Sequence, residues 1–570
     1  MNYKLYENSL NDTNQIIETI LLNRGIDDPI AYLTLDESCC NDYENLNNIQ
    51  EAVECFDKHL SEGNLISILV DTDPDGYTSA AALYNYIKRL DPNHPVQYVL
   101  HNENKTHGLA TMHKGDFIIP EGTRLFIIPD AGSNDVSQLN YLIESGIDCI
   151  CLDHHEIESD NQECHAIIVN NQASESYTCK DFSGVGIVYE FLRALDDYYL
   201  YDMANDYLDL VAFGNISDVM NIKNYQTRYY IEQGMYNIKN KFLKALDKAQ
   251  EFSTNGEINI HNISWYWTPI CNAMIRIGKY EDRELMFRAF IETDEVFPYQ
   301  KRGSNVIVDE DIYTRVARLC KNIKSRQDKM RDILCDALKA DVNPEDKVVM
   351  VVAPYDADPG IIGLAAMRLA DYVGKPCILL REKSRGVFNG SCRNCRNSPV
   401  KDFKELVNST RMFNFALGHA GAFGTEIYEE NLVDALEALN EALENIEYDD
   451  TIYCDFILDV DDISYEFINI IDESKWIYGQ GVEEPVVAVE NIPVTRYDCA
   501  VMGTNQDSVA FVVNGIKYCK FKCKENDLLL QFAKGNMDFD ITLNVVGKCS
   551  MNKYKGSSTP QFIIDDCEIV

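Results

Sequence analysis

The first third of this 570-residue chain contains four short apolar stretches, three of which are followed by an aspartate. The apolar stretches, separated by segments with helical spacing, are residues 65–70, 96–100, 125–128 and 149–152. Strands that alternate with helices in this way predict a parallel β-sheet in an α/β domain. Asp71, Asp130 and Asp153 stand directly after, or one residue beyond, three of these strands. Because functional side chains collect at the carboxyl ends of parallel strands, we expect the functional site at this edge.

The chain is too long for a single hydrophobic core, which predicts several domains. Apolar residues recur at helical spacing from 312 to 333 and predict one long helix that spans two domains. A second α/β unit begins at Lys347, and alternating runs near the C-terminus predict a small antiparallel barrel or sandwich. The expected divisions are a helical extension (1–54), a first α/β domain (55–225), a helical linker region (226–345), a smaller α/β domain (346–450) and a β domain (451–570).

The formal net charge of −41 argues, taken alone, against a nucleic-acid ligand, because phosphates attract Lys and Arg. The charge is unevenly spread, however, and residues 301–331 are rich in basic side chains. An acidic chain with a local basic groove can still hold a nucleic-acid strand, and bound divalent cations would offset acidity near a site.

The chain contains no apolar run that approaches the length of about 18 residues needed for a membrane span. The N-terminus lacks the apolar stretch of a secretion signal, so we expect a cytoplasmic protein. Its 19 cysteines occur at irregular spacing, and we interpret most of them as reduced, buried side chains. Cys392 and Cys395 form a CxxC pair without a second pair or matching histidines, so a zinc site there is a minor alternative.

Three carboxylates at alternate positions, Asp71, Asp73 and Asp75, follow the first buried strand and precede a helix. Like charges packed this closely cost free energy unless a cation neutralises them. A solvated acidic turn is the alternative. A calcium-binding EF-hand loop is disfavoured because Ala82 stands where that loop requires a Glu.

A second signal is the triplet Asp153, His154 and His155 after the strand 149–152. Adjacent residues at a strand end point in different directions, so one His can bind a metal while the other faces a substrate phosphate. A surface loop with two titrating histidines is the alternative. Asp130 and Asp218 are each typical of a helix cap or a turn, and they gain meaning only as members of the set.

These elements, in this order, resemble the DHH phosphoesterase superfamily, in which Asp153, His154 and His155 form the DHH triplet. The pattern from Asp71 to Ser79 is similar to the RecJ branch rather than to the small oligonucleotidases. Further segments that resemble RecJ motifs are residues 182–186, 269–276, 358–363, 390–393, 417–424 and 477–485. The resemblance runs from about residue 60 to the C-terminus, and a chance match of an ordered set this long is improbable.

The resemblance implies a DHH catalytic domain, a helical linker, a smaller α/β DHH-associated domain and a C-terminal antiparallel β barrel of the OB type. It implies a metal-dependent exonuclease that hydrolyses single-stranded DNA from 5′ to 3′ with two Mn²⁺ or Mg²⁺ ions. The implied metal ligands are Asp73, Asp75, Asp130, His154 and Asp218, with Asp71 either a ligand or a group that supports the ligands. His155 is expected to face the scissile phosphate, and His155, Asp130 and His154 are the expected catalytic residues.

The substrate contacts that the resemblance implies are Lys105, Arg276, Ser391, Arg393 and His419. Guanidinium groups match phosphate geometry, so Arg393 together with Ser391 is expected to hold a terminal phosphate. A buried structural histidine is the alternative for His419. In the OB-type domain, candidates for stacking on bases or binding the strand are Tyr497, Tyr518, Lys520, Phe521 and Lys522, and core packing is the alternative for each aromatic.

Three departures from the family pattern indicate a divergent relative, for which a phage origin is one interpretation. The Arg of the second motif, which grips a terminal phosphate, has no clear counterpart in residues 101–108. Lys105 is its nearest substitute, with a solvated surface lysine as the alternative. Ala131 replaces a motif Asn, and Leu417 replaces a motif Gly.

Two other functions stay open at the level of sequence. One is a phosphodiesterase for short oligonucleotides or cyclic dinucleotides, and the other is a non-catalytic replication or recombination factor. Retention of every implied metal position argues against the non-catalytic factor. The expected partner is single-stranded DNA, with RNA as an alternative ligand and a single-strand-binding protein or helicase as a candidate protein partner.

Overall fold

The computed structural model describes residues 1–7, 9–103, 106–157, 163–301, 303–395, 398–446, 451–536, 539–554 and 556–570. The chain forms two compact units. The first comprises residues 1–269, 284–317 and 451–570, and the second comprises residues 270–283 and 318–450. The sequence-based division into five domains stays a prediction.

A five-stranded parallel sheet forms the centre of the first α/β domain, as its alternating pattern predicts. Its order is β3-β2-β4-β5-β6. The strands are β2 (Leu65–Val70), β3 (Val96–Leu100), β4 (Thr123–Pro129), β5 (Asp148–Asp153) and β6 (Ile167–Asn170). β6 was not predicted from the sequence.

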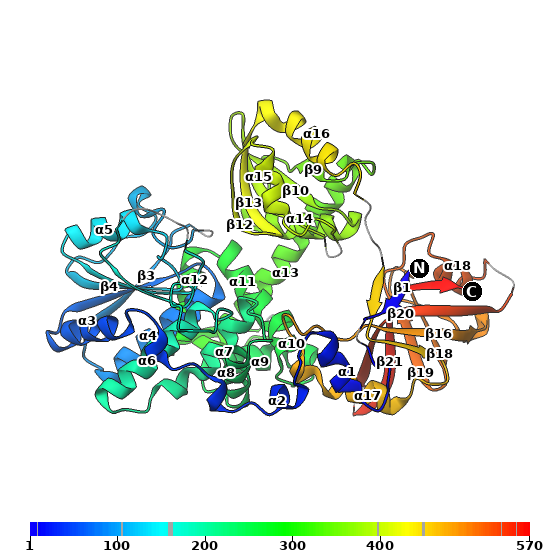
Figure 1. Cartoon of the computed structure of the whole chain (residues 1–570), viewed down its shortest axis with the longest axis horizontal. Helices are drawn as coiled ribbons and strands as arrows, with labels where there is room; N and C mark the ends of the chain where they lie inside the picture. Colours follow the sequence, from blue (N-terminus) through cyan, green and yellow to red (C-terminus); the bar gives the residue numbers. More distant parts are fainter. Residues whose placement is uncertain are drawn as a thin grey trace. The chain divides into compact units, whose positions relative to one another are not determined.

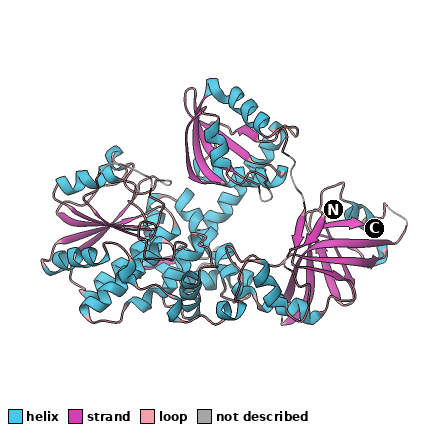
Figure 2. Cartoon of the chain, in the orientation of Figure 1, coloured by secondary structure: helices cyan, strands magenta, loops and turns pink. Residues whose placement is uncertain are grey.

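Helices cover both faces of this sheet (Figures 1 and 2). They are α3 (Ile49–Ser61), α4 (Pro74–Leu90), α5 (Val136–Glu144) and α6 (Gly184–Tyr199), and α7 (Leu208–Ser217) packs on α4 and α6. α5 lies on one face, and α3, α4 and α6 lie on the other (Figure 1). Helix α4 connects β2 to β3 on one side of the sheet, whereas α5 connects β4 to β5 toward the other side. The order in which strands are added therefore reverses between the parallel strands β2 and β4. Open α/β sheets bind ligands at the carboxyl ends of strands at such a reversal.

The region after the first α/β domain is mainly helical, as predicted. Its helices are α8 (Tyr225–Tyr236), α9 (Lys241–Thr254), α10 (Ile260–Asn262), α11 (Thr268–Ile277), α12 (Tyr280–Phe290) and α13 (Ile312–Leu338). A hairpin of β7 (Val296–Gln300) and β8 (Ile307–Asp311) precedes α13. The 27-residue α13 begins in the first unit and continues into the second, so the prediction of one long helix joining two domains is confirmed.

The second unit contains a mixed five-stranded sheet of order β12-β13-β11-β10-β9. Its strands are β9 (Val349–Val352), β10 (Cys377–Ser384), β11 (Val387–Arg393), β12 (Phe413–His419) and β13 (Ala422–Tyr428). Helices α14 (Pro359–Val373), α15 (Phe403–Ser409) and α16 (Leu432–Ala442) accompany them. Two hydrophobic clusters, one built with α14 and one with α15 and α16, pack against this sheet. The prediction of a smaller α/β domain is therefore confirmed.

The C-terminal region forms a seven-stranded sheet of order β15-β16-β20-β21-β19-β18-β17. The strands are β15 (Phe456–Asp459), β16 (Val487–Val494), β17 (Ala500–Met502), β18 (Ser508–Val513), β19 (Ile516–Lys520), β20 (Ile541–Tyr554) and β21 (Ser557–Ile569). Helices α17 (Tyr465–Glu473) and α18 (Leu528–Ala533) lie between strands in sequence. Most neighbours are antiparallel as predicted, but the β15–β16 and β19–β21 pairs are parallel.

Residues 1–54 were predicted to be helical, and this prediction is wrong for their first residues. Strand β1 (Tyr3–Leu5) pairs in parallel with β14 (Ile452–Cys454), and it is followed by α1 (Ile16–Asn23) and α2 (Pro29–Leu33). Arg24, directly after α1, forms a two-pronged ion pair of 2.8 and 3.0 Å with the buried carboxylate of Asp455. The N-terminal segment is thus joined to the C-terminal region by a strand and a buried charge pair.

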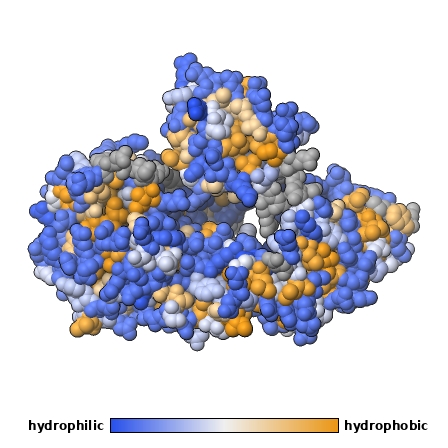
Figure 3. Space-filling view, viewed as in Figure 1, coloured by the Kyte–Doolittle hydropathy of each residue, from blue (hydrophilic) through white to orange (hydrophobic). Residues whose placement is uncertain are grey.

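The face of the molecule in Figure 3 is mainly hydrophilic, with scattered hydrophobic patches. Every helix in the described ranges is too short or too polar to cross a membrane. All 19 cysteines are free thiols and most are buried, which agrees with their interpretation as reduced side chains.

Candidate functional site

The turn after β2 carries three predicted site residues, and local hydrogen bonds set their directions. Asp73 caps α4, and its carboxylate accepts a 2.9 Å hydrogen bond from the Gly76 amide. Asp75, in the first turn of that helix, accepts hydrogen bonds from Ser183 Oγ and from the backbone amides of Gly184 (2.6 Å) and Val185 (3.1 Å). These amides belong to the start of α6, where the helix dipole stabilises a carboxylate.

Asp130 follows β4 with a left-handed backbone, φ 62°, which Asp tolerates better than most residues. Its amide donates to the Leu152 carbonyl at 2.8 Å and so continues the pairing of β4 with β5. A Cβ at Gly184 would lie 2.4 Å from Asp130 Oδ1, so only glycine lets the start of α6 approach this carboxylate. Both Asp130 carboxylate oxygens are buried, and neither accepts a hydrogen bond from the described residues.

The DHH triplet lies where β5 ends. The buried Asp153 carboxylate accepts hydrogen bonds from the amides of Ser133 (3.0 Å) and His154 (2.8 Å) and contacts His155 Nδ1 at 2.7 Å. Burial alone would raise the pKa of Asp153, but the contacts with His155 and His154 hold it well below its usual value. Asp153 therefore orients the His155 ring and holds the backbone of His154.

The two histidines differ in exposure. The His154 side chain is nearly buried, and its Nε2 lies 3.2 Å from Asp130 Oδ1 and 3.4 Å from Asp218 Oδ2. Asp218 lies directly after α7, at the C-cap position of that helix. The His155 ring is 37% exposed and stacks at a tilt on His154, so it is accessible to a substrate.

The predicted metal ligands converge on one place. Ligand atoms lie within 4.8 Å of one another in each of three overlapping groups, which are Asp71, Asp73 and Asp130, then Asp75, His154 and Asp218, and finally Asp130, His154 and His155. These residues come from segments far apart in sequence. They meet at the carboxyl edge of the sheet, where the order of strand addition reverses between β2 and β4.

The electrostatics of this cluster favour a cation. Burial, followed by the negative charge of Asp75, raises the pKa of Asp130 well above its usual value. Burial, followed by the charge of Asp73, raises the pKa of Asp75 to about 7. Buried carboxylates without enough donors or counter-charges are stabilised by a bound metal ion. Carboxylate oxygens with one or two imidazole nitrogens suit Mn²⁺ or Mg²⁺, so the donor set fits divalent metals.

His107 is a site residue that the sequence did not single out. Its Nδ1 lies 2.8 Å from Asp71 Oδ2, and the Gly108 amide donates to Asp71 Oδ1 at 2.9 Å. The Asp71 charge raises the pKa of His107 to about 10. The His107 ring also packs against His155, with 4.6 Å between ring centroids. Since both Asp71 oxygens already have partners, this geometry favours Asp71 as a group that supports the ligands. Lys105 lies outside the described residues.

Three predicted substrate contacts gather in the second unit, near the N-terminus of α14. A Cβ at Gly363 would lie 2.8 Å from Arg393 Nη2 and 3.4 Å from Ser391 Oγ, so this glycine leaves room in front of both side chains. Burial, followed by the positive charge of Arg276, lowers the pKa of Arg393. Two guanidinium groups that repel each other beside a hydroxyl group form a suitable anion site. His419 ends β12 in an exposed position, so the buried structural alternative is wrong.

The candidates in the C-terminal region divide by exposure. Tyr497 is 98% exposed and Phe521 is 52% exposed, so both rings are available for stacking. Tyr518 is buried and stacks on Phe511, which makes it a core residue rather than a base-stacking one. Lys520 is engaged in a 2.8 Å ion pair with Asp527, whereas Lys522 is exposed.

Comparisons with known proteins support the resemblance to the DHH and RecJ families that the motifs indicate. Residues 65–215 match the DHH family, N-terminal domain, and residues 454–566 match the RecJ OB domain. The chain is 36% identical to the putative SPbeta prophage-derived single-strand DNA-specific exonuclease YorK of Bacillus subtilis strain 168, across 100% of this chain and 98% of that protein. The chain belongs to the RecJ family. The family membership confirms the resemblance indicated by the motifs, and the prophage origin of this relative fits the interpretation of a divergent, phage-borne member.

Two further comparisons give matches at lower identity. The single-stranded-DNA-specific exonuclease RecJ of Bacillus subtilis is 24% identical, across 97% of this RecJ-family chain and 68% of that protein. The crystal structure of RecJ in complex with Mn²⁺ from Thermus thermophilus matches with a TM-score of 0.73 at 18% identity, covering 100% of this chain and 78% of the other. This likeness, together with the matched DHH and OB domains, confirms the predicted fold class.

Proposed function

We propose that this RecJ-family chain is a metal-dependent exonuclease that hydrolyses the phosphodiester bonds of single-stranded DNA from the 5′ end. The observation that carries the proposal is the convergence of Asp73, Asp75, Asp130, His154 and Asp218 at the carboxyl edge of the parallel sheet. The family membership supports the substrate class, because the 36% identical relative is named as a single-strand DNA-specific exonuclease.

Asp73, Asp75, Asp130, His154 and Asp218 would hold two divalent cations, Mn²⁺ or Mg²⁺. Two such ions, when bound, activate a water molecule for attack on phosphorus and neutralise the phosphate oxygens. His107 and Gly108 hold the Asp71 carboxylate, and Asp153 holds the His155 ring, so these two groups are positioned before substrate arrives. Groups held in place in this way lower the activation free energy, because less entropy is lost on reaching the transition state.

His155 is proposed to contact the scissile phosphate. Its Nδ1 is engaged by Asp153, which fixes the orientation of the ring, while the ring itself is partly exposed. The Asp153 carboxylate stabilises a positive charge on His155, and an imidazolium would donate a hydrogen bond from Nε2 to a phosphate oxygen.

Ser391, Arg393 and Arg276 are proposed to hold the 5′-terminal phosphate. Their support is the anion site near Gly363, where two arginines and a hydroxyl meet the start of a helix. Exposed His419, Tyr497 and Phe521 are proposed to contact the rest of the strand. We also propose the five predicted domains as its functional divisions, and a single-strand-binding protein or helicase as the partner that presents unwound DNA.

A product assay tests the proposal. The full chain is incubated with Mn²⁺ and a long single strand carrying a 5′-phosphate and a 3′ fluorophore, and products are separated by size. We expect labelled strands that shorten from the 5′ end down to the labelled terminal nucleotide, loss of activity with EDTA and no digestion of a blunt duplex. Cleavage restricted to oligomers of a few nucleotides would replace the proposal with an oligonucleotide phosphodiesterase. A chain that binds Mn²⁺ and cleaves none of these substrates would be a non-catalytic factor.

A further inference from the structure

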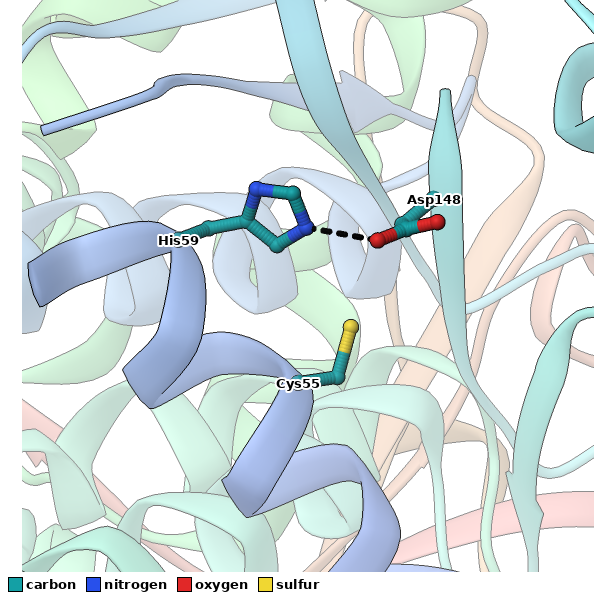
Figure 4. Close-up of side chains that lie close together, drawn as sticks. All are labelled: Cys55, His59 and Asp148. Carbon is teal, nitrogen blue, oxygen red and sulfur yellow. Dashed lines mark hydrogen bonds and ion pairs between the residues drawn. The ribbon is translucent and has the colours of Figure 1, made fainter. Parts of the chain in front are cut away.

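A second group of metal-binding side chains lies outside the catalytic cluster, on α3 and β5. Cys55 and His59 are four residues apart on α3, so one helical turn places them on the same side. Asp148 is the first residue of β5 and faces them (Figure 4). One ligand atom from each of the three lies within 4.8 Å of the others.

We propose that Cys55, His59 and Asp148 bind a transition-metal ion of the Zn²⁺ or Co²⁺ class. The proposal is independent of the proposed nuclease function. Thiolate and imidazole ligands select such ions, whereas the carboxylate-rich cluster at the other end of β5 suits Mn²⁺ or Mg²⁺. Three protein ligands and one water molecule complete the four-coordinate geometry that zinc prefers.

The two sites are separate. Asp148 begins β5 and Asp153 ends it, next to the catalytic histidines. At about 3.3 Å per residue, this strand holds the two sites roughly 17 Å apart. A metal at Cys55 therefore shares no ligand with the catalytic cluster, and it would link α3 to the amino end of the central sheet.

The contacts present without metal show what binding must change. His59 Nε2 lies 2.8 Å from Asp148 Oδ2, and Lys58 Nζ lies 2.9 Å from the same oxygen. Metal binding at Nε2 replaces the proton there, and Lys58, which is 55% exposed, can turn into solvent. Asn64 Nδ2 lies 3.1 Å from His59 Nδ1, and rotation of this amide would let its carbonyl accept the Nδ1 proton. Such support of the second ring nitrogen is usual for metal-bound histidine.

The thiol must also lose a proton when the metal binds. Burial raises the pKa of Cys55 to about 11, so the metal-free side chain is protonated and unreactive. The metal–thiolate bond compensates for this deprotonation, and one proton is released per metal bound. Because the ion would tie α3 to β5 only in the folded chain, binding should also stabilise the fold.

Cobalt absorption tests the site directly. The full chain is first stripped with EDTA, dialysed and supplied with excess Mn²⁺ to fill the catalytic cluster, and it is then titrated with CoCl₂ under reducing conditions. A Co²⁺–thiolate bond produces a near-ultraviolet charge-transfer band, which carboxylate and imidazole ligands cannot produce. We expect the band to saturate at one Co²⁺ per chain and to persist in Asp130→Asn, which alters only the catalytic cluster.

Matched variants assign the band to its ligands. Cys55→Ser should abolish it, and His59→Asn should weaken Co²⁺ binding at least tenfold, whereas Cys164→Ser, another partly buried cysteine of the same domain, should retain it. ZnSO₄ should raise the melting temperature of the wild type and not that of Cys55→Ser. A wild-type chain without the band, or a band that survives in Cys55→Ser, would overturn the proposal.

Discussion

Replacing Asp130 with Asn should stabilise the metal-free protein while abolishing its activity. One carboxylate oxygen from each of Asp71, Asp73 and Asp130 lies within 4.8 Å of the other two. At an effective dielectric constant of about 20, two unit charges at this separation repel by about 3 kcal/mol. Proton uptake by the buried carboxyls relieves part of this repulsion, so we expect a net gain of roughly 2 kcal/mol from the neutral amide. Active sites commonly sacrifice stability for function in this way.

Thermal unfolding in EDTA measures this gain. A stabilisation of about 2 kcal/mol corresponds to a rise in melting temperature of roughly 2 °C for a compact unit as large as the one that contains Asp130. Adding Mn²⁺ should then stabilise the wild type strongly and the variant weakly, because the variant has lost a proposed ligand. Glu144→Gln removes an exposed carboxylate of the same domain and is the control, with no expected change. The reasoning is refuted if Asp130→Asn melts no higher than the wild type in EDTA, or if it digests DNA at the wild-type rate.

Three further predictions concern other parts of the chain. Arg393→Lys keeps the positive charge but loses the planar guanidinium group that binds phosphate with two hydrogen bonds. KM for 5′-phosphorylated strands should therefore rise about tenfold, while KM for 5′-hydroxyl strands stays unchanged. Equal effects on both substrates would contradict a contact with the terminal phosphate. Asp455→Asn leaves Arg24 buried with a weakened partner and should cost about 3–5 kcal/mol of stability, seen as a lower melting temperature and faster proteolysis near the N-terminus. Burial acts to raise the pKa of Asp472, but Lys475 and Lys553 hold it below its usual value, so its stabilisation is present at neutral pH and is lost as pH falls through the lowered pKa. Asp472→Asn should therefore melt below the wild type at pH 7, with a difference that shrinks in acid; a constant difference would exclude this linkage.

The proposed metal-binding cluster could be predicted from the sequence because several of its members follow recognisable apolar strands. Asp71 and Asp130 come after apolar runs, and parallel strands place such residues at one edge. Motif order then indicated which carboxylates belong together. What could not be predicted is which oxygen faces a metal, since that depends on hydrogen bonds such as those from Gly108 to Asp71 and from Gly184 to Asp75.

Other features have no local sequence signal. His107 lies in a loop without periodicity, and its contact with Asp71 exists only because this loop reaches the residue that follows β2. The Arg24–Asp455 ion pair joins residues 431 positions apart, and the β1–β14 pair joins residues that are still more distant in sequence. Single residues that meet across such distances leave no periodic pattern in the chain, which explains the wrong prediction for the first residues.

The central claim is that Asp73, Asp75, Asp130, His154 and Asp218 together bind a pair of divalent cations. Anomalous X-ray scattering from crystals of the full chain grown with Mn²⁺ measures this directly. We predict two peaks about 3.5–4 Å apart, surrounded by these five side chains, and their loss in Asp130→Asn crystals. Full Mn²⁺ occupancy elsewhere in the chain, with no peak among these residues, would contradict the account.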